Sequence, residues 1–291
     1  MKVLLTGAGG QLGQALARTV PAGVQLLTRT HRELDIADAA AVSGAIKAFE
    51  PQVLINAAAY TAVDRAESEP ERAAAVNATG PELLGAALRA WPDARLVQIS
   101  TDYVFSGQVS QPLSIRAVTD PISVYGRTKR DGESAVMRVL GARAVVVRTA
   151  WLYSASEGNF VTTILKHLRT KGVIRVVDDQ TGSPTATTSV AQAVWRAVEQ
   201  ETIHGVLHWT DSGAATRFEF AAAIDELGRA AGLIGGPTQV IPVTSQEYPT
   251  PARRPTHCVL DLGESAQQLR LDPVPWRDRL REVIGSIGDR E

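Results

Sequence analysis

Short apolar runs alternate with longer alanine-rich stretches through the first half of the chain. The short runs are rich in β-branched residues, as buried strands are, whereas the stretches between them carry apolar residues at helical spacing. We expect strands at Lys2–Thr6, Val24–Thr28, Val53–Asn56, Arg95–Ser100 and Arg143–Arg148. We expect helices at Gln11–Val20, at Asp38–Glu50, after Pro70 and at Ser123–Val139. This alternation predicts an α/β fold with a doubly wound parallel sheet.

Beyond Trp151 the alternation becomes irregular. We expect helices at Phe160–Leu168, Ser189–Glu199, Arg217–Ala231 and Trp276–Ile287, and strands at Val173–Asp178 and Val206–Trp209. Glycine and proline interrupt the later chain at 235–237 and 248–251. The pattern predicts a first domain over 1–149 and a smaller α+β C-terminal substrate lobe over 150–172 and 211–291. Whether the elements of 173–210 rejoin the first sheet stays open.

Composition narrows the class of protein without naming a function. The 291 residues carry 30 Lys+Arg and 31 Asp+Glu, a net charge of −1, so a nucleic-acid binder is not expected. The single cysteine, Cys258, excludes an intrachain disulfide, and the five histidines lack metal-ligand spacing. No stretch reaches the roughly 18 apolar residues of a membrane span, and no signal sequence is evident. We therefore expect a cytoplasmic protein without membrane partners.

A glycine-rich turn follows the first expected strand. Gly7, Gly10 and Gly13 form a G-x-x-G-x-x-G pattern between a strand and a helix, which is the context of a dinucleotide-binding turn. Glycine permits the tight turn, and the N–H groups of a helix starting at Gln11 and Leu12 suit a pyrophosphate. The pattern predicts a Rossmann-type dinucleotide site; the alternative is a tight turn without a ligand.

The end of the second expected strand bears on the choice of dinucleotide. An acid usually stands there to bind the ribose hydroxyls of NAD, whereas this chain has Arg29 and Arg32 and no acid in residues 28–32. Because a guanidinium suits a 2′-phosphate, we predict NADPH, with NADH as a weaker cofactor. An ordinary solvated basic loop is the alternative. Asp35 and Ile36 are expected at the adenine end.

Two segments follow the third expected strand. Ala57, Ala58 and Ala59 are small enough for a dinucleotide to lie across the sheet, although close helix packing would also favour alanine. Further along, the acidic residues Asp64, Glu67, Glu69 and Glu71 are expected to form a solvated helix face.

Two other segments carry groups suited to carbonyl reduction. Thr101 comes at the end of the fourth expected strand, while Tyr125 and Lys129 are four residues apart and share one helix face. A phenol can give a proton to a developing alkoxide, and a nearby ammonium stabilises the phenolate that remains. The Thr101 hydroxyl can polarise the carbonyl. Together with the glycine turn, these residues predict a nicotinamide-dependent reductase in which Tyr125 and Lys129 also touch the cofactor.

In these motifs the chain resembles the extended short-chain dehydrogenases/reductases and, within them, the dTDP-4-dehydrorhamnose reductase family. The segments that carry the resemblance are Thr6–Gly13, Asn56–Asp64, Ala66–Pro70, Ser100–Phe105, Val124–Lys129, Arg148–Trp151, Asp179–Thr185 and Tyr248–Pro255. The resemblance implies reduction by NADPH of the 4-keto group of dTDP-4-dehydro-6-deoxy-L-mannose to dTDP-L-rhamnose. That is a step of dTDP-rhamnose and lipopolysaccharide O-antigen biosynthesis.

The resemblance also implies residue roles. The implied catalytic residues are Thr101, Tyr125 as proton donor and Lys129 as its electrostatic partner. The implied substrate-facing residues are Thr101, Asp102, Tyr103, Trp151 and, for the diphosphate, Arg254. The implied cofactor-lining residues are Ala59, Tyr60 and Thr61. Two alternatives stay open, because Trp151 could be a core aromatic and Arg253 with Arg254 a solvated pair.

The metal content, oligomeric state and reaction type are less constrained. Some members of the family bind magnesium at a dimer interface through a carboxylate at the position of Ala15, so we expect no magnesium and a monomer or weak homodimer. One alternative function is an epimerase or dehydratase of the same superfamily. Another is a non-catalytic NADP-binding regulatory subunit similar to that of methionine adenosyltransferase. Such a subunit could lose the catalytic Tyr or Lys, so the presence of Thr101, Tyr125 and Lys129 argues against this alternative.

Overall fold

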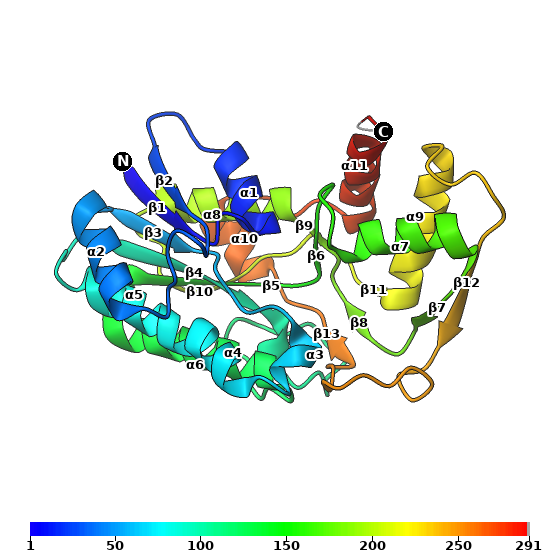
Figure 1. The fold of residues 1–291 in the computed structure, drawn as a ribbon, viewed down its shortest axis with the longest axis horizontal. Helices are drawn as coiled ribbons and strands as arrows, with labels where there is room; N and C mark the ends of the chain where they lie inside the picture. Colours follow the sequence, from blue (N-terminus) through cyan, green and yellow to red (C-terminus); the bar gives the residue numbers. More distant parts are fainter. Residues whose placement is uncertain (290–291) are drawn as a thin grey trace.

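A six-stranded parallel sheet forms the centre of the first part of the molecule (Figure 1). The computed structural model describes residues 1–289. In spatial order the strands are β10 (Gly205–His208), β5 (Ala144–Thr149), β4 (Arg95–Thr101), β3 (Val53–Asn56), β1 (Lys2–Thr6) and β2 (Gln25–Arg29). Every neighbouring pair is parallel. The order reverses between β1 and β3, and doubly wound sheets bind ligands beside such a switch point. The predicted fold class is confirmed.

Helices cover both faces of this sheet. One face packs on α1 (Gln11–Arg18) and α8 (Thr187–Glu199), and the other on α2 (Ala39–Phe49), α5 (Gly80–Leu88) and α6 (Val124–Leu140). Because successive strand residues point to opposite faces, Val3 and Leu5 join the first core and Leu4 joins the second. All three are fully buried, which explains the continuous apolar runs of the sequence. Within the described chain, no helix is long and apolar enough to cross a membrane.

The region after Pro70 differs from the single helical stretch that the sequence predicts. After a short α3 (Val63–Ala66), the chain forms α4 (Pro70–Ala74), a π-helical turn (Ala75–Thr79) and α5. The turn buries Asn77, whose amide accepts from the Tyr60 backbone N–H at 2.8 Å and donates to the Tyr60 carbonyl at 3.0 Å. The same amide donates to the Thr128 hydroxyl at 3.1 Å. Asn77 therefore ties the loop after β3 to helix α6.

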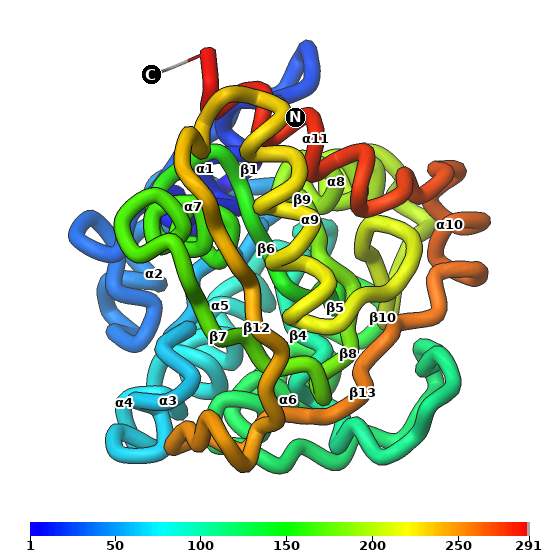
Figure 2. The backbone as a smooth tube through the Cα atoms, turned by 90° about the vertical axis from the view of Figure 1, so that its right-hand side faces the viewer, coloured from blue at the N-terminus to red at the C-terminus, as the bar shows by residue number. Residues whose placement is uncertain are grey.

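A further hydrophobic core, separate from the two on the faces of the sheet, lies in the C-terminal half. It is built from α7 (Phe160–Lys171), α9 (Arg217–Ala230) and α11 (Trp276–Gly288), with β7 (Val173–Val177) pairing in parallel with β12 (Gln239–Val243), as Figure 2 shows. At its centre the buried Phe220 ring contacts the rings of Tyr153, Phe160 and Trp276. The sequence analysis predicts the three helices and β7 but not β12, which lies between the two glycine- and proline-rich segments.

Short strands and one further helix complete the fold. Strand β8 (Thr181–Gly182) lies between β11 (Ala215–Thr216) and β13 (His257–Cys258), and β6 (Leu152–Tyr153) pairs with β9 (Thr185–Ala186). Helix α10 (Gly263–Leu269), which the sequence analysis does not predict, adds Leu269 to the core under α8. Single-turn 3-10 helices lie at Asp102–Val104 and Gly141–Arg143.

Candidate active site

The glycine turn leaves a helix N-terminus without a side-chain cap. Gly10 is the N-cap of α1, and within the described residues this helix has no side-chain cap hydrogen bond. Gly7 has φ +71°, and a Cβ there would lie 2.4 Å from the Ala58 nitrogen. A Cβ on Gly13 would lie 2.2 Å from the Gly7 carbonyl oxygen. The turn therefore requires glycine at Gly7 and Gly13, and the free N–H groups suit an anion such as a dinucleotide pyrophosphate.

Two neighbouring cavities lie at the carboxyl edge of the sheet. The larger, about 460 Å³, extends from the glycine turn to Trp151 and α9, and the smaller, about 310 Å³, extends toward the end of β2. They share walls at Gly10, Ala57 and Ala59. A pair of connected cavities at a switch point is the place where doubly wound folds hold a dinucleotide and its substrate.

Most residues predicted for the site line these cavities. The larger cavity is lined by Gln11, Leu12, Gly13, Thr61, Tyr125 and Lys129 among the predicted cofactor residues. It is also lined by the predicted substrate residues Thr101, Asp102, Tyr103 and Trp151. The smaller cavity is lined by Gly7, Asp35, Ile36, Ala58 and Tyr60. Two predicted residues line neither cavity: Arg29, whose Nη1 donates to the Thr28 carbonyl at 3.0 Å, and Arg254.

Two glycines of α6 allow this helix to lie close to neighbouring backbone. A Cβ on Gly126 would lie 2.1 Å from the Tyr103 carbonyl oxygen, and one on Gly132 would lie 2.1 Å from the Asn77 carbonyl oxygen. Ser123 caps the helix by accepting from the Gly126 N–H at 3.1 Å. Gly126 thus lets the start of α6, with Tyr125, lie against the backbone that follows β4, and Gly132 lets the helix lie against the π-helical turn. A larger residue at either glycine would meet backbone there.

Burial sets the pKa of two of the three predicted catalytic residues, Lys129 and Tyr125. The Lys129 ammonium donates to the Ile99 carbonyl at 2.6 Å, and burial lowers the pKa of Lys129 to about 8 although the Glu133 carboxylate opposes the shift. Burial raises the pKa of the Tyr125 phenol well above its ordinary value, and a hydrogen bond with Thr101 opposes this rise. The phenol is therefore held protonated, as a proton donor to a carbonyl oxygen must be.

Asp102 lies beside these residues in the cavity wall. It is 2% exposed, and its carboxylate accepts a hydrogen bond from the Thr101 hydroxyl at 2.9 Å. Burial raises the pKa of Asp102 to about 6, against the effects of the Thr101 hydrogen bond and the Arg217 charge. The Tyr103 ring meets the Tyr125 ring edge-on, with centroids 5.6 Å apart. Thr101, Asp102, Tyr103 and Tyr125 thus form one wall.

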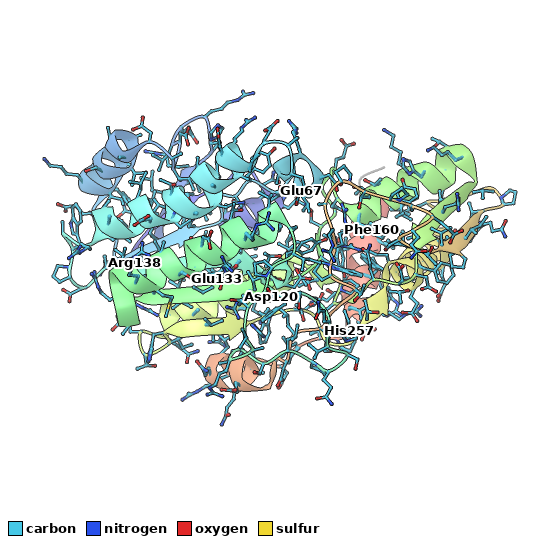
Figure 3. All side chains as sticks on the ribbon, turned by 90° about the horizontal axis from the view of Figure 1, so that it is seen from below. Glu67, Asp120, Glu133, Arg138, Phe160 and His257 are labelled. Carbon is cyan, nitrogen blue, oxygen red and sulfur yellow. The ribbon has the colours of Figure 1, made fainter. Side chains whose placement is uncertain are left out.

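A buried ionic network, which the sequence analysis does not predict, lies behind this wall. Arg148 of β5 donates from Nε and Nη2 to the Glu133 carboxylate of α6 at 2.7–3.1 Å, and both side chains are 6% exposed. The Ser100 hydroxyl donates to the same carboxylate. Burial and Arg148 lower the pKa of His208 to about 4, so this ring is neutral beside the Arg148 guanidinium. Figure 3 shows Glu133 on α6. In the sequence of this helix Glu133 comes four residues after Lys129, which is about one turn.

The acidic residues of the α3–α4 region are partly or fully exposed, as the sequence predicts, but three of them also accept hydrogen bonds that the sequence does not predict. Asp64 accepts from Arg254 at 2.7 and 3.0 Å and from the Ala252 N–H at 3.1 Å. Glu67 accepts from the Val124 N–H at 2.8 Å, so it supports the first turn of α6. Glu69 accepts from the Tyr60 hydroxyl at 2.9 Å. Three of these carboxylates therefore hold loops around the cavities in place, which their spacing alone could not reveal.

Several cavity-lining side chains were absent from the prediction. Arg217, the first residue of α9, and Asn159, the N-cap of α7, line the larger cavity, while His31 and Arg72 line the smaller one. Asn159 carried a signal, because it begins a capping box, but that signal indicates a helix start and not a site. No sequence motif identified Arg217 as a site residue, since only the fold brings the start of α9 close to Trp151 after β5.

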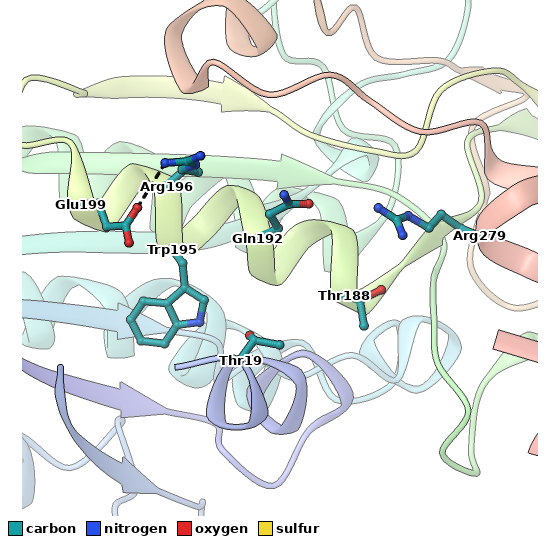
Figure 4. Close-up of a pocket in the computed structure, with 7 residues that line it drawn as sticks. All are labelled: Thr19, Thr188, Gln192, Trp195, Arg196, Glu199 and Arg279. Carbon is teal, nitrogen blue, oxygen red and sulfur yellow. Dashed lines mark ion pairs between the residues drawn. The ribbon is translucent and has the colours of Figure 1, made fainter. Parts of the chain in front are cut away.

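A further hollow of about 430 Å³ lies away from the predicted site residues, between α1, α8 and α11 (Figure 4). Its walls are formed by Thr19, Thr188, Gln192, Trp195, Arg196, Glu199 and Arg279. Arg196 pairs with Glu199, three residues further along α8, at 3.6 Å. It holds none of the groups suited to carbonyl chemistry, so the active site is assigned to the two cavities at the sheet edge.

The fold and these two cavities define the chain as a nicotinamide-dependent oxidoreductase of the extended short-chain dehydrogenase/reductase class. The family described as "RmlD substrate binding domain" matches residues 1–288. The chain belongs to this family, that of the dTDP-4-dehydrorhamnose reductases, and the resemblance predicted from the motifs is confirmed.

Two curated relatives and one solved structure illustrate the similarity. A dTDP-4-dehydrorhamnose reductase from Mycolicibacterium smegmatis is 41% identical, over 98% of this chain and 86% of the relative. A probable dTDP-4,6-dihydroxy-2-methyloxan-3-one 4-ketoreductase from Streptomyces antibioticus is 39% identical, over 99% of this chain and 96% of the relative. The crystal structure of the Bacillus anthracis dTDP-4-dehydrorhamnose reductase in complex with NADP is 30% identical and superposes with a TM-score of 0.90, over 97% and 98% of the two chains.

Proposed function

We propose that the protein reduces the 4-keto group of dTDP-4-dehydro-6-deoxy-L-mannose to give dTDP-L-rhamnose, with NADPH as reductant. The observation that carries the proposal is the meeting of Thr101, Tyr125 and Lys129 in one cavity with the uncapped N-terminus of α1. The reductases from Mycolicibacterium smegmatis and Bacillus anthracis support the substrate by their names. The glycine turn and the cavity that it shares fit a dinucleotide.

In this proposal each catalytic residue has one task. The nicotinamide supplies a hydride to the C4 carbon when it is bound. The Tyr125 phenol gives its proton to the C4 oxygen as negative charge develops there. The Thr101 hydroxyl donates to the Asp102 carboxylate at 2.9 Å in this structure, and it would stabilise that charge by turning its proton to the C4 oxygen when substrate binds. The Lys129 ammonium stabilises the phenolate of Tyr125, and Asp102, Tyr103 and Trp151 orient the sugar.

The pH profile tests the role of Lys129. Since its pKa is about 8, the charged form predominates below that pH, and we expect kcat/KM for reduction to fall as the pH rises above about 8. Glu133 is the carboxylate that faces the ammonium, and the phenol of Tyr125 stays protonated over this range. Lys129→Arg keeps its charge at every working pH, so the fall is expected to disappear from the profile of that variant. A fall that persists in Lys129→Arg would assign it to another group.

The preference for NADPH is a second testable part of the proposal. The NADP complex of the Bacillus anthracis reductase supports it, and Arg29 at the end of β2 is the residue that we propose binds the 2′-phosphate. Loss of one charge-assisted contact should raise the KM for NADPH about tenfold in Arg29→Ala and leave that for NADH unchanged. Arg18→Ala, in the last turn of α1, is the matched control. Equal use of NADH and NADPH by the wild type would contradict the preference.

The remaining expectations follow from the same proposal. We propose that residues 1–149, with β10, hold the cofactor and that the C-terminal lobe holds the sugar nucleotide. We propose that the enzyme acts in the cytoplasm. We also propose that it is a monomer or weak homodimer without magnesium, because Ala15 is buried in α1 and carries no side-chain atom that could bind the metal. Sedimentation of the purified protein with and without a chelator measures both the oligomeric state and any effect of metal.

A second candidate function is the reduction of a related dTDP-4-keto sugar. The Streptomyces antibioticus relative, a probable 4-ketoreductase whose name gives a different dTDP-sugar substrate, favours this candidate. Comparing kcat/KM for dTDP-4-dehydrorhamnose with that for other dTDP-4-keto sugars separates the two substrates. Consumption of one NADPH for each sugar reduced separates either reductase from an epimerase or dehydratase, which regenerates its cofactor in every cycle.

A further inference from the structure

Arg217 and Trp151 form a stacked pair in the wall of the larger cavity. The Arg217 guanidinium carbon lies 3.5 Å from the centroid of the Trp151 ring and 5.3 Å from that of Phe160. Stacking restrains the plane of a guanidinium and leaves the N–H groups at its edge available for a ligand. The pair therefore presents an oriented set of hydrogen-bond donors to the cavity.

The backbone around Trp151 shows that this position is strongly constrained. Trp151 has φ +44°, in a region that residues with a side chain rarely adopt. The indole lies against Gly182 of β8, where a Cβ would approach the indole Cε2 to 2.6 Å. A strained aromatic residue persists only where its surroundings determine its place, and such strain is concentrated at ligand sites.

The charge of Arg217 is not neutralised by an ion pair. Among residues 1–289 no carboxylate oxygen lies within 4.0 Å of its guanidinium, whereas Arg254, the residue predicted for the diphosphate, is paired with Asp64 at 2.7 Å. The groups that act on the charge of Arg217 are Tyr103, Asp102 and the cation Arg254, and Asp102 also accepts from Thr101. Because Arg217 is only partly exposed, forms no ion pair within 4.0 Å among the described residues and lies near the charge of Arg254, an anion in the cavity would stabilise it.

We propose that Arg217, held flat by Trp151, binds the diphosphate of the nucleotide-sugar substrate. The proposal rests on the proposed reductase function and names the residue that recognises its substrate. The diphosphate is the charged part of a nucleotide sugar, and the guanidinium fork matches phosphate oxygens. Arg217 shares one cavity with Thr101 and Tyr125, so the diphosphate and keto ends of one substrate can be held together. The cofactor pyrophosphate has its own place at the glycine turn.

The test is calorimetric titration of dTDP into the NADP-loaded protein. Arg217→Met removes the charge and keeps an unbranched side chain on Trp151. The dissociation constant for dTDP is expected to rise about 10- to 100-fold, while that for NADPH stays within about twofold. Arg277→Met is the matched control, because Arg277 also lies over a tryptophan ring, Trp276, but lies on α11 outside the cavity.

A second variant keeps the test decisive if Arg217→Met folds poorly. Arg217→Lys retains a charge and is expected to weaken dTDP binding less than Arg217→Met does. An unchanged dTDP affinity in both variants, an equal loss in both, or a loss of NADPH affinity instead would overturn the proposal. A wild type that binds dTDP through Arg217 but does not reduce the keto sugar would refute the reductase function and leave the binding role standing.

Discussion

Tyr125→Phe is expected to lower kcat for keto-sugar reduction by about 10³-fold, within the range found for general-acid residues. The variant removes the phenol whose proton neutralises the developing alkoxide and leaves the ring that packs on Tyr103. Burial raises the pKa of this phenol and keeps it protonated throughout the working pH range. The loss of activity in Tyr125→Phe is therefore expected at every pH in that range. Steady-state kinetics with saturating NADPH measure the effect, and the dissociation constant for NADPH is expected to stay unchanged.

Tyr103→Phe provides the comparison for this result. Tyr103 lines the same cavity, and its ring centroid lies 5.6 Å from that of Tyr125, but in the proposed mechanism it orients the sugar and gives no proton. Loss of one hydrogen bond to substrate should change kcat/KM by less than about tenfold. A Tyr125→Phe enzyme that stays within tenfold of the wild type would show that another group supplies the proton.

Arg148→Met is expected to lower the free energy of unfolding by about 3–5 kcal/mol, because it leaves the buried Glu133 carboxylate without its cation. The two side chains are 6% exposed and joined by bonds of 2.7–3.1 Å. The loss comes mainly from the charge that remains behind, so a buried pair is far more sensitive to the removal of one member than an exposed pair. Urea denaturation followed by circular dichroism measures it.

Helix α6 offers a matched control for this change. Arg138 lies on the same helix, as Figure 3 shows, and pairs with Glu82 of α5 at 2.8 Å, but the two side chains are 65% and 47% exposed. Arg138→Met is therefore expected to cost less than about 1 kcal/mol. Equal losses in the Arg148 and Arg138 variants would mean that the network behind the active site contributes no more than a surface contact.

The parts of the fold that could be predicted are those encoded by local pattern. Apolar runs such as Val53–Asn56 indicate buried strands because both faces of a parallel strand are covered. The glycine turn and the Tyr125–Lys129 spacing are also local, and they come together because strands and helices alternate in a doubly wound sheet. Local pattern therefore sufficed for the strands of residues 1–149 and for one side of the cavity, but not for the place of β10, which joins the same sheet beside β5.

The parts that could not be predicted depend on contacts between distant segments. The pair of Asp64 with Arg254 joins residues 190 positions apart, and strand β12 forms only because β7 lies beside it. The same holds for Arg217, which no motif identifies and which reaches the cavity only when α9 packs behind Trp151. A short strand or a lone charged residue carries no signal of this kind in its own sequence.

The transfer of labelled hydride tests the proposed reaction most directly. The purified protein is incubated with dTDP-4-dehydrorhamnose and NADPH that carries deuterium at its transferable position, and the sugar product is analysed by mass spectrometry and NMR. We predict dTDP-L-rhamnose with one deuterium at C4 and one oxidised cofactor for each sugar. An unlabelled product, or a keto sugar altered without net oxidation of NADPH, would contradict the assignment of this protein as a 4-keto reductase.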